Sequence, residues 1–410
     1  MVEFYSDISQ FEPLMPANCG PLEDRAFELT QISAGLAREL HPATLDGVRE
    51  LLRIINSYYS NLIEGNDTHP IAVERAMRED YSSDPARRDR QKESLIHIEV
   101  QRAIEGRLDE DEELEVTSPE FLKWVHHEFY KQMPESLSWA HGDGGEAERV
   151  IPGEFREREV AVGRHLPPTH SSIPAFVHRF NEFYSPARRH GLQKIVAIAA
   201  AHHRLMWIHP FLDGNGRVAR LFTDAYFLRI GLAGYGLWNA SRGLARRNAD
   251  YKRHLAEADL AREGDLDGRG NLSDRRLTSF CSFFLDVCID QARYMSGMLA
   301  LDGLLERIDR YAEKRNEGRI VDKSGKPVPP LPGGSALLLR ETAIAGELPR
   351  NTVIEIVGKS ERTARTVTRT LIDEGLLVPT SDWHRSPFRL AFPPHAAGYL
   401  FPNLFPDTEH

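Results

Sequence analysis

The stretch at 209–220 reads His-Pro-Phe-Leu-Asp-Gly-Asn-Gly-Arg-Val-Ala-Arg and gathers groups that move protons and bind phosphate. His209 carries an imidazole, the side chain whose ordinary pKa best suits proton removal near neutral pH. Asp213 offers a carboxylate of the kind that binds Mg²⁺ beside phosphate oxygens. Arg217 and Arg220 lie three residues apart, so on a helix they would share a face and direct positive charge toward a polyphosphate.

Two apolar patterns with helical spacing flank this stretch and would position it. One covers 195–201, and the other consists of Val218, Leu221, Phe222, Ala225 and Leu228. Gly214 and Gly216 let the backbone turn sharply between the two helices and approach a ligand closely. The free N–H groups of the second helix's first turn then form an anion site. Each of these residues alone also suits an ordinary Gly-rich turn with solvated arginines, but their combination in twelve residues is far more specific.

At every defining position the stretch resembles the signature of the Fic family, His-x-Phe-x-(Asp/Glu)-Gly-Asn-Gly-Arg-x-x-Arg. The resemblance implies a protein adenylyltransferase, which moves AMP from ATP onto a Ser, Thr or Tyr hydroxyl of a target protein. It implies that His209 is the catalytic base and that Asp213 holds Mg²⁺. The phosphates of ATP would be held by Gly214, Asn215, Gly216, Arg217 and Arg220.

Two further residues follow from the family resemblance alone. Asn248 and Tyr251 lie where family members place groups near the adenine of the nucleotide. Tyr251 suits a place in the hydrophobic core equally well, so both readings stay open for it.

A helix expected over 44–64 ends in Ser60-x-x-x-Glu64-Gly65. The helix dipole disfavours a carboxylate at this end, so Glu64 needs a cationic partner unless it is a plain surface residue. The motif resembles the inhibitory motif of Fic proteins, (Ser/Thr)-x-x-x-Glu-(Gly/Asn), in which the glutamate pairs with the last arginine of the signature. Here that arginine is Arg220, and the pair would leave ATP only an unproductive pose. Glu64 would act on its own chain or on a partner in a homodimer, which we expect for this protein.

Composition sets the protein class. The chain has 410 residues, a formal charge of -10, 41% hydrophobic and 27% charged residues, which is typical of a soluble globular protein with two or three domains. The acidic balance argues against nucleic-acid affinity over the whole surface. Cys19, Cys281 and Cys288 form no Cys-x-x-Cys pair, which argues against a zinc finger or a disulfide framework. The sequence contains neither a signal-peptide pattern nor an apolar run long enough for a bilayer, so we expect a cytoplasmic protein without membrane contact.

Two pairs of adjacent histidines invite a metal-site interpretation, His126-His127 and His202-His203. Neighbours on a helix point about 100° apart and cannot chelate one ion together. We therefore expect both pairs to be structural.

The expected fold is mainly α: a Fic-type helical bundle with a short β-hairpin flap, plus a C-terminal winged-helix domain. The helical pattern breaks at 149–168, where a strand or hairpin fits. In Fic proteins a flap at this place clamps the target's backbone by strand addition, and an ordinary hairpin is the alternative. The expected division is an N-terminal helical region at 1–94 with the inhibitory helix 44–64, a catalytic domain at 95–300, a helix and linker at 301–334, and a winged helix-turn-helix-like domain at 335–410.

The winged-helix expectation rests on the order of the last elements. Helical patterns at 335–345, 349–357 and 360–374 precede two β patterns, at 375–378 and 388–392, that bracket Trp383-His384-Arg385. Basic residues gather on one side of the third pattern, as a recognition helix requires, namely Lys359, Arg362, Arg365 and Arg369. Acidic residues offset them, namely Glu361, Asp373 and Glu374. DNA binding through 335–392 and protein contact are both hypotheses for this region.

The same residues are also compatible with other functions. A Fic-fold enzyme of another kind would transfer phosphate, UMP or phosphocholine, or remove AMP. A non-enzymatic protein would sense nucleotide in the central domain and bind DNA as a regulator. The intact signature favours ATP and AMP transfer over both.

Overall fold

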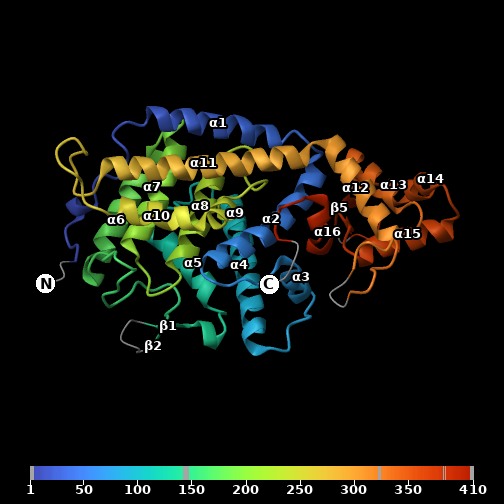
Figure 1. The fold of residues 1–410 in the computed structure, drawn as a ribbon, viewed down its shortest axis with the longest axis horizontal. Helices are drawn as coiled ribbons and strands as arrows, with labels where there is room; N and C mark the ends of the chain where they lie inside the picture. Colours follow the sequence, from blue (N-terminus) through green and yellow to red (C-terminus); the bar gives the residue numbers. More distant parts are fainter. Residues whose placement is uncertain (1–3, 142–146, 322–324, 382, 384, 407–410) are drawn as a thin grey trace.

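The computed structural model describes residues 4–141, 147–321, 325–381, 383 and 385–406 (Figure 1). Within those residues the chain forms sixteen α-helices and two small β-sheets, which confirms the expected mainly α fold with a short hairpin. Part of the expected linker, 322–324, and His384 of the expected wing lie outside the described residues. None of the helices in the described part has the length and hydrophobicity that a bilayer crossing requires.

The first half of the described chain contains α1 (Gly20–Leu36), α2 (Pro42–Ile63), α3 (Pro70–Met77), α4 (Pro85–Glu110), α5 (Pro119–Tyr130), α6 (Ile173–Tyr184), α7 (Gln193–Ile208) and α8 (Asn215–Arg229). The second half contains α9 (Ala240–Arg246), α10 (Asn248–Ala258), α11 (Asp274–Leu299), α12 (Leu301–Asn316), α13 (Ser335–Ala345), α14 (Val353–Val357), α15 (Glu361–Asp373) and α16 (Pro394–Leu400). The strands are β1 (Trp139–His141), β2 (Ala147–Arg149), β3 (Glu347–Leu348), β4 (Leu377–Pro379) and β5 (Phe388–Leu390).

Proline and a capping residue set the starts of the N-terminal helices. Proline occupies the first position of α2, α3, α4 and α5, where its missing N–H costs no helical hydrogen bond. The residue before each proline accepts a backbone N–H with its side chain, as Ser118 does from Phe121 at 3.0 Å. In α2 this arrangement starts the helix at Pro42, two residues before the expected start, and the helix ends at Ile63.

The core of the helical bundle surrounds α7 and α8. The small residues Ala199, Ala200 and Ala201 of α7 are fully buried, which lets neighbouring helices approach its backbone closely. α7 packs against α6, α8 and α11, while α1 and α11 run side by side along one edge of the molecule (Figure 1). The turn between α7 and α8 is therefore held by two buried helices.

The β-hairpin lies ahead of the segment in which it was expected. β1 pairs antiparallel with β2, with Trp139 opposite Arg149. Apart from Arg149, the described residues of 149–168 form one isolated antiparallel bridge, between Val162 and His165. The predicted position of the hairpin was wrong because prolines interrupt this segment, namely Pro152, Pro167 and Pro168. A proline has no backbone N–H to donate to a β-ladder.

Residues 335–390 form a small unit of three helices and one sheet. Its order is α13, β3, α14, α15, β4 and β5, and the antiparallel sheet has the strand order β3-β5-β4. The start and end of α13 match the expected 335–345, whereas β3 and α16 were not expected. This unit lies at one end of the molecule, and β5 packs against α2 (Figure 1). At Gly47 of α2, a side chain would start 2.5 Å from the carbonyl oxygen of Leu390, so only glycine allows this packing.

The fully buried histidines of the bundle include three with strongly lowered pKa values, namely His97, His126 and His202. Burial lowers the pKa of each to about 3. Below pH 6.5 the unfolded chain binds a proton on each imidazole, whereas the folded chain does so only near pH 3.

We therefore expect the free energy of unfolding to fall as the pH drops from 6.5 toward 3, by about 1.4 kcal/mol per pH unit for each buried histidine. Urea unfolding at several pH values checks this. Replacing His202 by glutamine should flatten the profile, whereas replacing the exposed His178 should not. A free energy of unfolding that stays level between pH 6.5 and 4 would contradict the account.

Candidate active site

The turn between α7 and α8 depends on two residues with left-handed backbone. His209 ends α7 with φ 48° and ψ 60°. Gly214 precedes α8 with φ 78°, and a side chain there would start 2.6 Å from the ring of Tyr130. The first helical hydrogen bond of α8 runs from the N–H of Val218 to the carbonyl of Gly214, so the earlier amides of the helix have no helical acceptor. These amides are the groups from which the sequence predicts an anion site.

Asn215 holds the turn closed with its side chain. Its Oδ1 accepts the N–H of Phe211 at 2.9 Å, and its Nδ2 donates to the carbonyl of Phe211 at 2.8 Å. His126 stacks on the ring of Phe211 at 4.1 Å and meets the carbonyl of Asp213 through Nε2 at 3.3 Å. Both ends of the Asn215 amide are therefore engaged in the turn. Its backbone N–H, in the first turn of α8, is the group that remains for an anion.

His209 carries a neutral imidazole at pH 7. Burial, together with the smaller effects of nearby His165 and Arg156, lowers its pKa to about 4. The side chain is partly exposed, while its Nδ1 is buried and has no hydrogen-bond partner among the described residues. A neutral imidazole with an exposed edge can accept a proton from an incoming hydroxyl.

Asp213 belongs to a cluster that links the turn to α4 and α5. Its Oδ2 accepts from the hydroxyl of Tyr130 at 2.9 Å and from Nη2 of Arg217 at 3.2 Å. Arg217 also pairs with Glu93 of α4. Burial would raise the pKa of Asp213, but the charge of Arg217 and hydrogen bonds from Gly214 and Tyr130 bring it below its ordinary value. Asp213 is therefore ionised at neutral pH, and its side chain is 42% exposed.

This cluster can supply one ligand to a metal ion. No group of three or more His, Cys, Asp or Glu residues with metal-binding geometry occurs in the described part of the chain. Mg²⁺ at phosphate sites takes only one or two carboxylates and fills its shell with phosphate oxygens and water. A single ionised and half-exposed Asp213 fits that pattern.

The buried Arg220 forms an ion pair with Glu64 of the same chain, whose side chain is 36% exposed. Nη2 of Arg220 lies 2.6 Å from Oε1 of Glu64 and 2.9 Å from the carbonyl oxygen of Ser60, and Nε lies 2.9 Å from the hydroxyl of Ser60. Burial alone would raise the pKa of Glu64, but the charges of Arg220 and Arg217 bring it below its ordinary value. The structure thus brings together the three residues that the inhibitory motif predicted to meet.

The carboxylate of Glu64 lies directly over the N-terminal turn of α8. A side chain at Gly216 would start 2.2 Å from Oε1 of Glu64 and 3.1 Å from Nη1 of Arg220. Glu64 therefore places a negative charge against the amides and the arginine that form the anion site. An incoming phosphate would have to displace it.

Comparison with known families identifies this region. Residues 116–227 match the family model described as the Fic/DOC family, and they include the whole stretch 209–220. These residues form a Fic domain. The matched range also contains Tyr130, Arg156 and the hairpin β1–β2.

The Fic domain has curated relatives at moderate identity. The protein adenylyltransferase Fic of Drosophila mojavensis is 29% identical over 139 residues, which cover 33% of this chain and 28% of that protein. The protein of the same name from Drosophila grimshawi is 36% identical over 87 residues, which cover 21% of this chain and 18% of that protein. The chain thus spans less than a third of the length of either relative.

A solved structure shares the fold over most of the chain. The crystal structure of a Fic family protein from Desulfovibrio desulfuricans G20 superposes with a TM-score of 0.51 at 19% sequence identity. The match covers 92% of this chain and 98% of that one. The likeness concerns the fold.

Arg156 holds the backbone of the turn between α7 and α8 in place through hydrogen bonds. No local sequence pattern had pointed to this residue. This buried residue donates from Nε to the carbonyl of His209 at 3.0 Å, from Nη2 to the carbonyl of Pro168 at 2.5 Å and from Nη1 to the carbonyl of Arg158 at 2.8 Å. Its own N–H donates to the carbonyl of Pro210 at 2.9 Å. Arg156 thereby ties the segment 156–168 to the backbone of the catalytic candidate His209.

A second contact fastens the same segment to the Fic domain. Nε2 of His165 lies 2.7 Å from the carbonyl oxygen of Trp207, the last but one residue of α7. The bridge between Val162 and His165 closes a tight turn whose outer residues are exposed, Val162 by 41%. Segment 156–168 therefore presents an exposed turn beside His209.

We expect the change of Arg156 to lysine to lower the transfer rate up to about 10²-fold, as displacement of a catalytic group by about 1 Å does. Lysine keeps the charge but cannot hold the carbonyls of His209, Pro168 and Arg158 together. Steady-state kinetics of the purified variant would show the loss in kcat. Arg149 to lysine, an exposed change on β2, is the matched control and should leave kcat unchanged. Equal kcat for both variants would exclude a positioning role for Arg156.

The two residues predicted to lie near adenine have different environments. Tyr251 is 1% exposed, and its hydroxyl lies 2.7 Å from Nε2 of the buried His202, whose Nδ1 lies 2.7 Å from the hydroxyl of Thr223. The structure therefore assigns Tyr251 to the core, the second of its two readings. Asn248 begins α10, and its Oδ1 is buried without a hydrogen-bond partner among the described residues. Both expected structural histidine pairs also lie in the bundle, with His202 and His203 fully buried.

Proposed function

We propose that this protein is a protein adenylyltransferase that moves AMP from ATP to a Ser, Thr or Tyr hydroxyl of a target protein. One observation carries the proposal: a neutral His209 stands at one end of a closed turn whose other end is a helix N-terminus flanked by Arg217 and Arg220. This arrangement joins a base to a polyphosphate site within one stretch of chain. Relatives of the Fic domain that bear the name protein adenylyltransferase support the same reaction.

ATP would bind with its phosphates over the turn. The backbone N–H groups of Asn215 and Gly216 would donate to the α- and β-phosphates, and Arg217 would neutralise the β-phosphate. Arg220 would receive the γ-phosphate once Glu64 has left it. Mg²⁺, when held by Asp213, would supply positive charge against the phosphate oxygens.

The transfer itself requires little covalent chemistry from the protein. His209 would take the proton of the target hydroxyl while the hydroxyl oxygen attacks the α-phosphorus. The bond from the α-phosphorus to the bridging oxygen of the β-phosphate breaks, and pyrophosphate leaves with the electron pair. Positioning and charge neutralisation dominate such a reaction, which suits a site made of a fixed turn and arginines.

Segment 156–168 would present the target. Its exposed turn lies beside His209 and is fastened to the site by Arg156 and His165. An extended peptide of the target would add to this turn through backbone hydrogen bonds, so that its hydroxyl meets the imidazole. The family resemblance implied this role, the binding of the target's backbone, for a flap at 149–168.

Glu64 would keep the enzyme inactive at rest. It occupies Arg220 and sets a negative charge where the γ-phosphate belongs. ATP would then bind only with its phosphates displaced from the productive pose, so activity requires the movement or removal of Glu64.

The position of the transferred label tests the reaction type. The Glu64→Gly protein is incubated with cell lysate and ATP labelled on either the α- or the γ-phosphate. AMP transfer predicts that protein acquires label from the α-labelled nucleotide alone. Label from the γ-position would indicate phosphate transfer, and label from UTP in a parallel incubation would indicate UMP transfer; either result would overturn the proposal.

A second candidate function concerns 335–392, which we propose to be a winged helix-turn-helix. The arginines of α15 are exposed, as a recognition helix requires, but Arg365 pairs with Glu361 at 2.5 Å and Arg369 with Asp373 at 3.6 Å. We expect duplex DNA to bind weakly and with strong salt dependence, if the arginines contact phosphates. Fluorescence anisotropy with Arg362→Ala checks this, and unchanged anisotropy at low salt favours a protein partner for this unit.

A further inference from the structure

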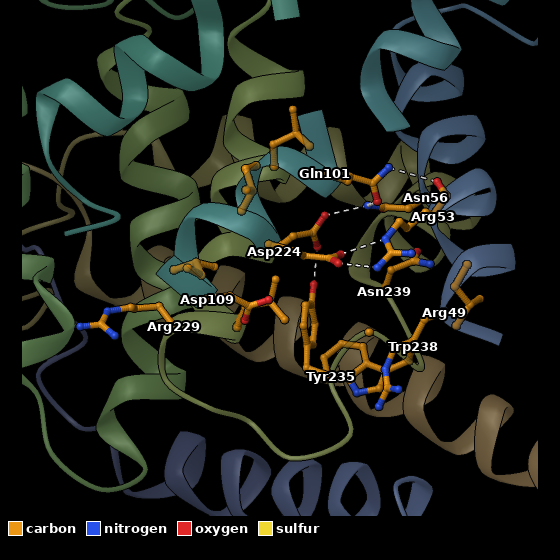
Figure 2. Close-up of a pocket in the computed structure, with 17 residues that line it drawn as sticks. Arg49, Arg53, Asn56, Gln101, Asp109, Asp224, Arg229, Tyr235, Trp238 and Asn239 are labelled. Carbon is orange, nitrogen blue, oxygen red and sulfur yellow. Dashed lines mark hydrogen bonds and ion pairs between the residues drawn. The ribbon is translucent and has the colours of Figure 1, made fainter. Parts of the chain in front are cut away.

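A cavity of about 320 Å³ lies outside the turn between α7 and α8, where α2, α4 and α8 meet the segment 235–239 (Figure 2). Its volume falls at the lower end of the range of small-molecule sites, about 300–1,000 Å³. Asp224 of α8 and Asn56 of α2 both line it. Asp224 follows Arg220 by one helical turn, and Asn56 precedes Ser60 by one helical turn.

Asp224 is a carboxylate without a counterion. Its Oδ2 accepts from Nδ2 of Asn56 at 2.7 Å, and its Oδ1 accepts from the hydroxyl of Tyr235, so both partners are neutral (Figure 2). Throughout the described residues, no ion pair includes Asp224. Burial raises its pKa to about 6, the direction expected of a carboxylate whose charge is not compensated.

Two of the arginines that line the cavity are engaged elsewhere. Arg53 binds the carboxylate of Glu105 through two nitrogens, one of them at 3.0 Å, and Arg49 pairs with Asp46 at 2.6 Å. These side chains therefore bring little net charge to the cavity.

The remaining charged residues of the lining are Asp109 and Arg229, and neither forms an ion pair with another described residue. Figure 2 shows the guanidinium of Arg229 directed away from Asp224. Among the charged side chains of the lining, the carboxylates of Asp224 and the exposed Asp109 and the guanidinium of Arg229 therefore have no ion-pair partner among the described residues.

We propose that this cavity binds a small organic amine, with an ammonium group against the carboxylate of Asp224. An ammonium donates up to three hydrogen bonds, and each oxygen of an ionised carboxylate has lone pairs for a second donor, here in addition to Asn56 and Tyr235. A diamine would direct its other ammonium toward Asp109. A divalent metal ion fits less well, because no group of three or more metal-binding side chains occurs in the described residues.

The occupied cavity would strengthen the contact between α2 and α8. The ammonium would neutralise Asp224 while the hydrogen bond from Asn56 stays in place, one turn from the contact of Ser60 and Glu64 with Arg220. An amine would thus favour the inhibited arrangement. This consequence rests on the proposed function, whereas the binding itself does not.

Titration calorimetry with 1,4-diaminobutane, without nucleotide, tests the site. We expect the diamine to bind the wild-type protein and 1,4-butanediol, which has the same length and no charge, not to bind. Asp224→Asn should lower the affinity for the diamine about tenfold or more, as loss of a charged hydrogen bond does. Asp302→Asn, an exposed change on α12, should leave binding unchanged.

A second variant guards against misfolding of Asp224→Asn. Asp109→Asn changes an exposed side chain. It should lower the affinity for 1,4-diaminobutane and leave the affinity for 1-butylamine unchanged. Absence of diamine binding to the wild type, equal binding of the diol, or unchanged binding after both aspartate changes would each overturn the proposal. Because no ATP is present, failure here leaves the transferase proposal untouched.

Discussion

Replacement of Glu64 by glycine should raise the rate of AMP transfer by about 10- to 10²-fold, the factor that corresponds to the roughly 1.5–3 kcal/mol of a hydrogen bond between charged groups. The wild-type protein holds Arg220 through the carboxylate of Glu64 at 2.6 Å and through two contacts with Ser60. Glycine removes the carboxylate and frees the guanidinium for the γ-phosphate. It also removes the negative charge over Gly216, so the helix N-terminus regains its attraction for phosphate.

Initial rates with labelled ATP, for the wild type and Glu64→Gly, measure this effect. Glu79→Gly is the matched control, because Glu79 is exposed and has φ 63°, a conformation that glycine adopts without strain. Ser60→Ala should give a smaller increase, since it removes only one of the contacts of Arg220. A Glu64→Gly protein that is no faster than Glu79→Gly would show that the pair does not inhibit.

Loss of His209 should lower the rate of the activated Glu64→Gly protein by about 10²- to 10⁴-fold, the usual contribution of a general base. Its imidazole is neutral at pH 7 because burial lowers its pKa to about 4, so it is ready to accept a proton. Alanine leaves the turn without a base, although Gly214, Asn215 and the start of α8 still hold the phosphates.

The effect of His209→Ala should therefore fall on kcat, with nucleotide affinity nearly unchanged. Single-turnover kinetics and equilibrium binding of ATP separate the two quantities. His178→Ala, a change of an exposed histidine on α6, serves as the control. If His209→Ala lost affinity for ATP and kept its rate at saturating nucleotide, the imidazole would be a binding group and not the base.

Local patterns predicted the parts of the site that lie close together in the chain. His209, Asp213, Arg217 and Arg220 fall within one turn and the helix after it, so their spacing alone indicated a phosphate site. The contact of Glu64 with Arg220 was predicted from the short motif that contains Glu64. Helix ends were predicted best where a cap marks them, as at Ser118.

Residues whose partners are distant in the chain had no such signal. Glu93 meets Arg217 across 124 residues, and Tyr130 meets Asp213 across 83. Arg156 acts on backbone carbonyls, which every residue has, so sequence cannot distinguish it from a surface arginine. The two hydrogen bonds by which the Asn215 amide closes the turn on Phe211 also depend on the folded geometry, so the sequence did not indicate them.

The most direct test compares wild-type, Glu64→Gly and Glu64→Gly/His209→Ala proteins, each incubated with Mg²⁺, lysate and ATP labelled on the α-phosphate. The account predicts labelled protein with Glu64→Gly, and little or none with the wild type or the double variant. Equal label with the double variant, or no label with Glu64→Gly while ATP still binds, would contradict it.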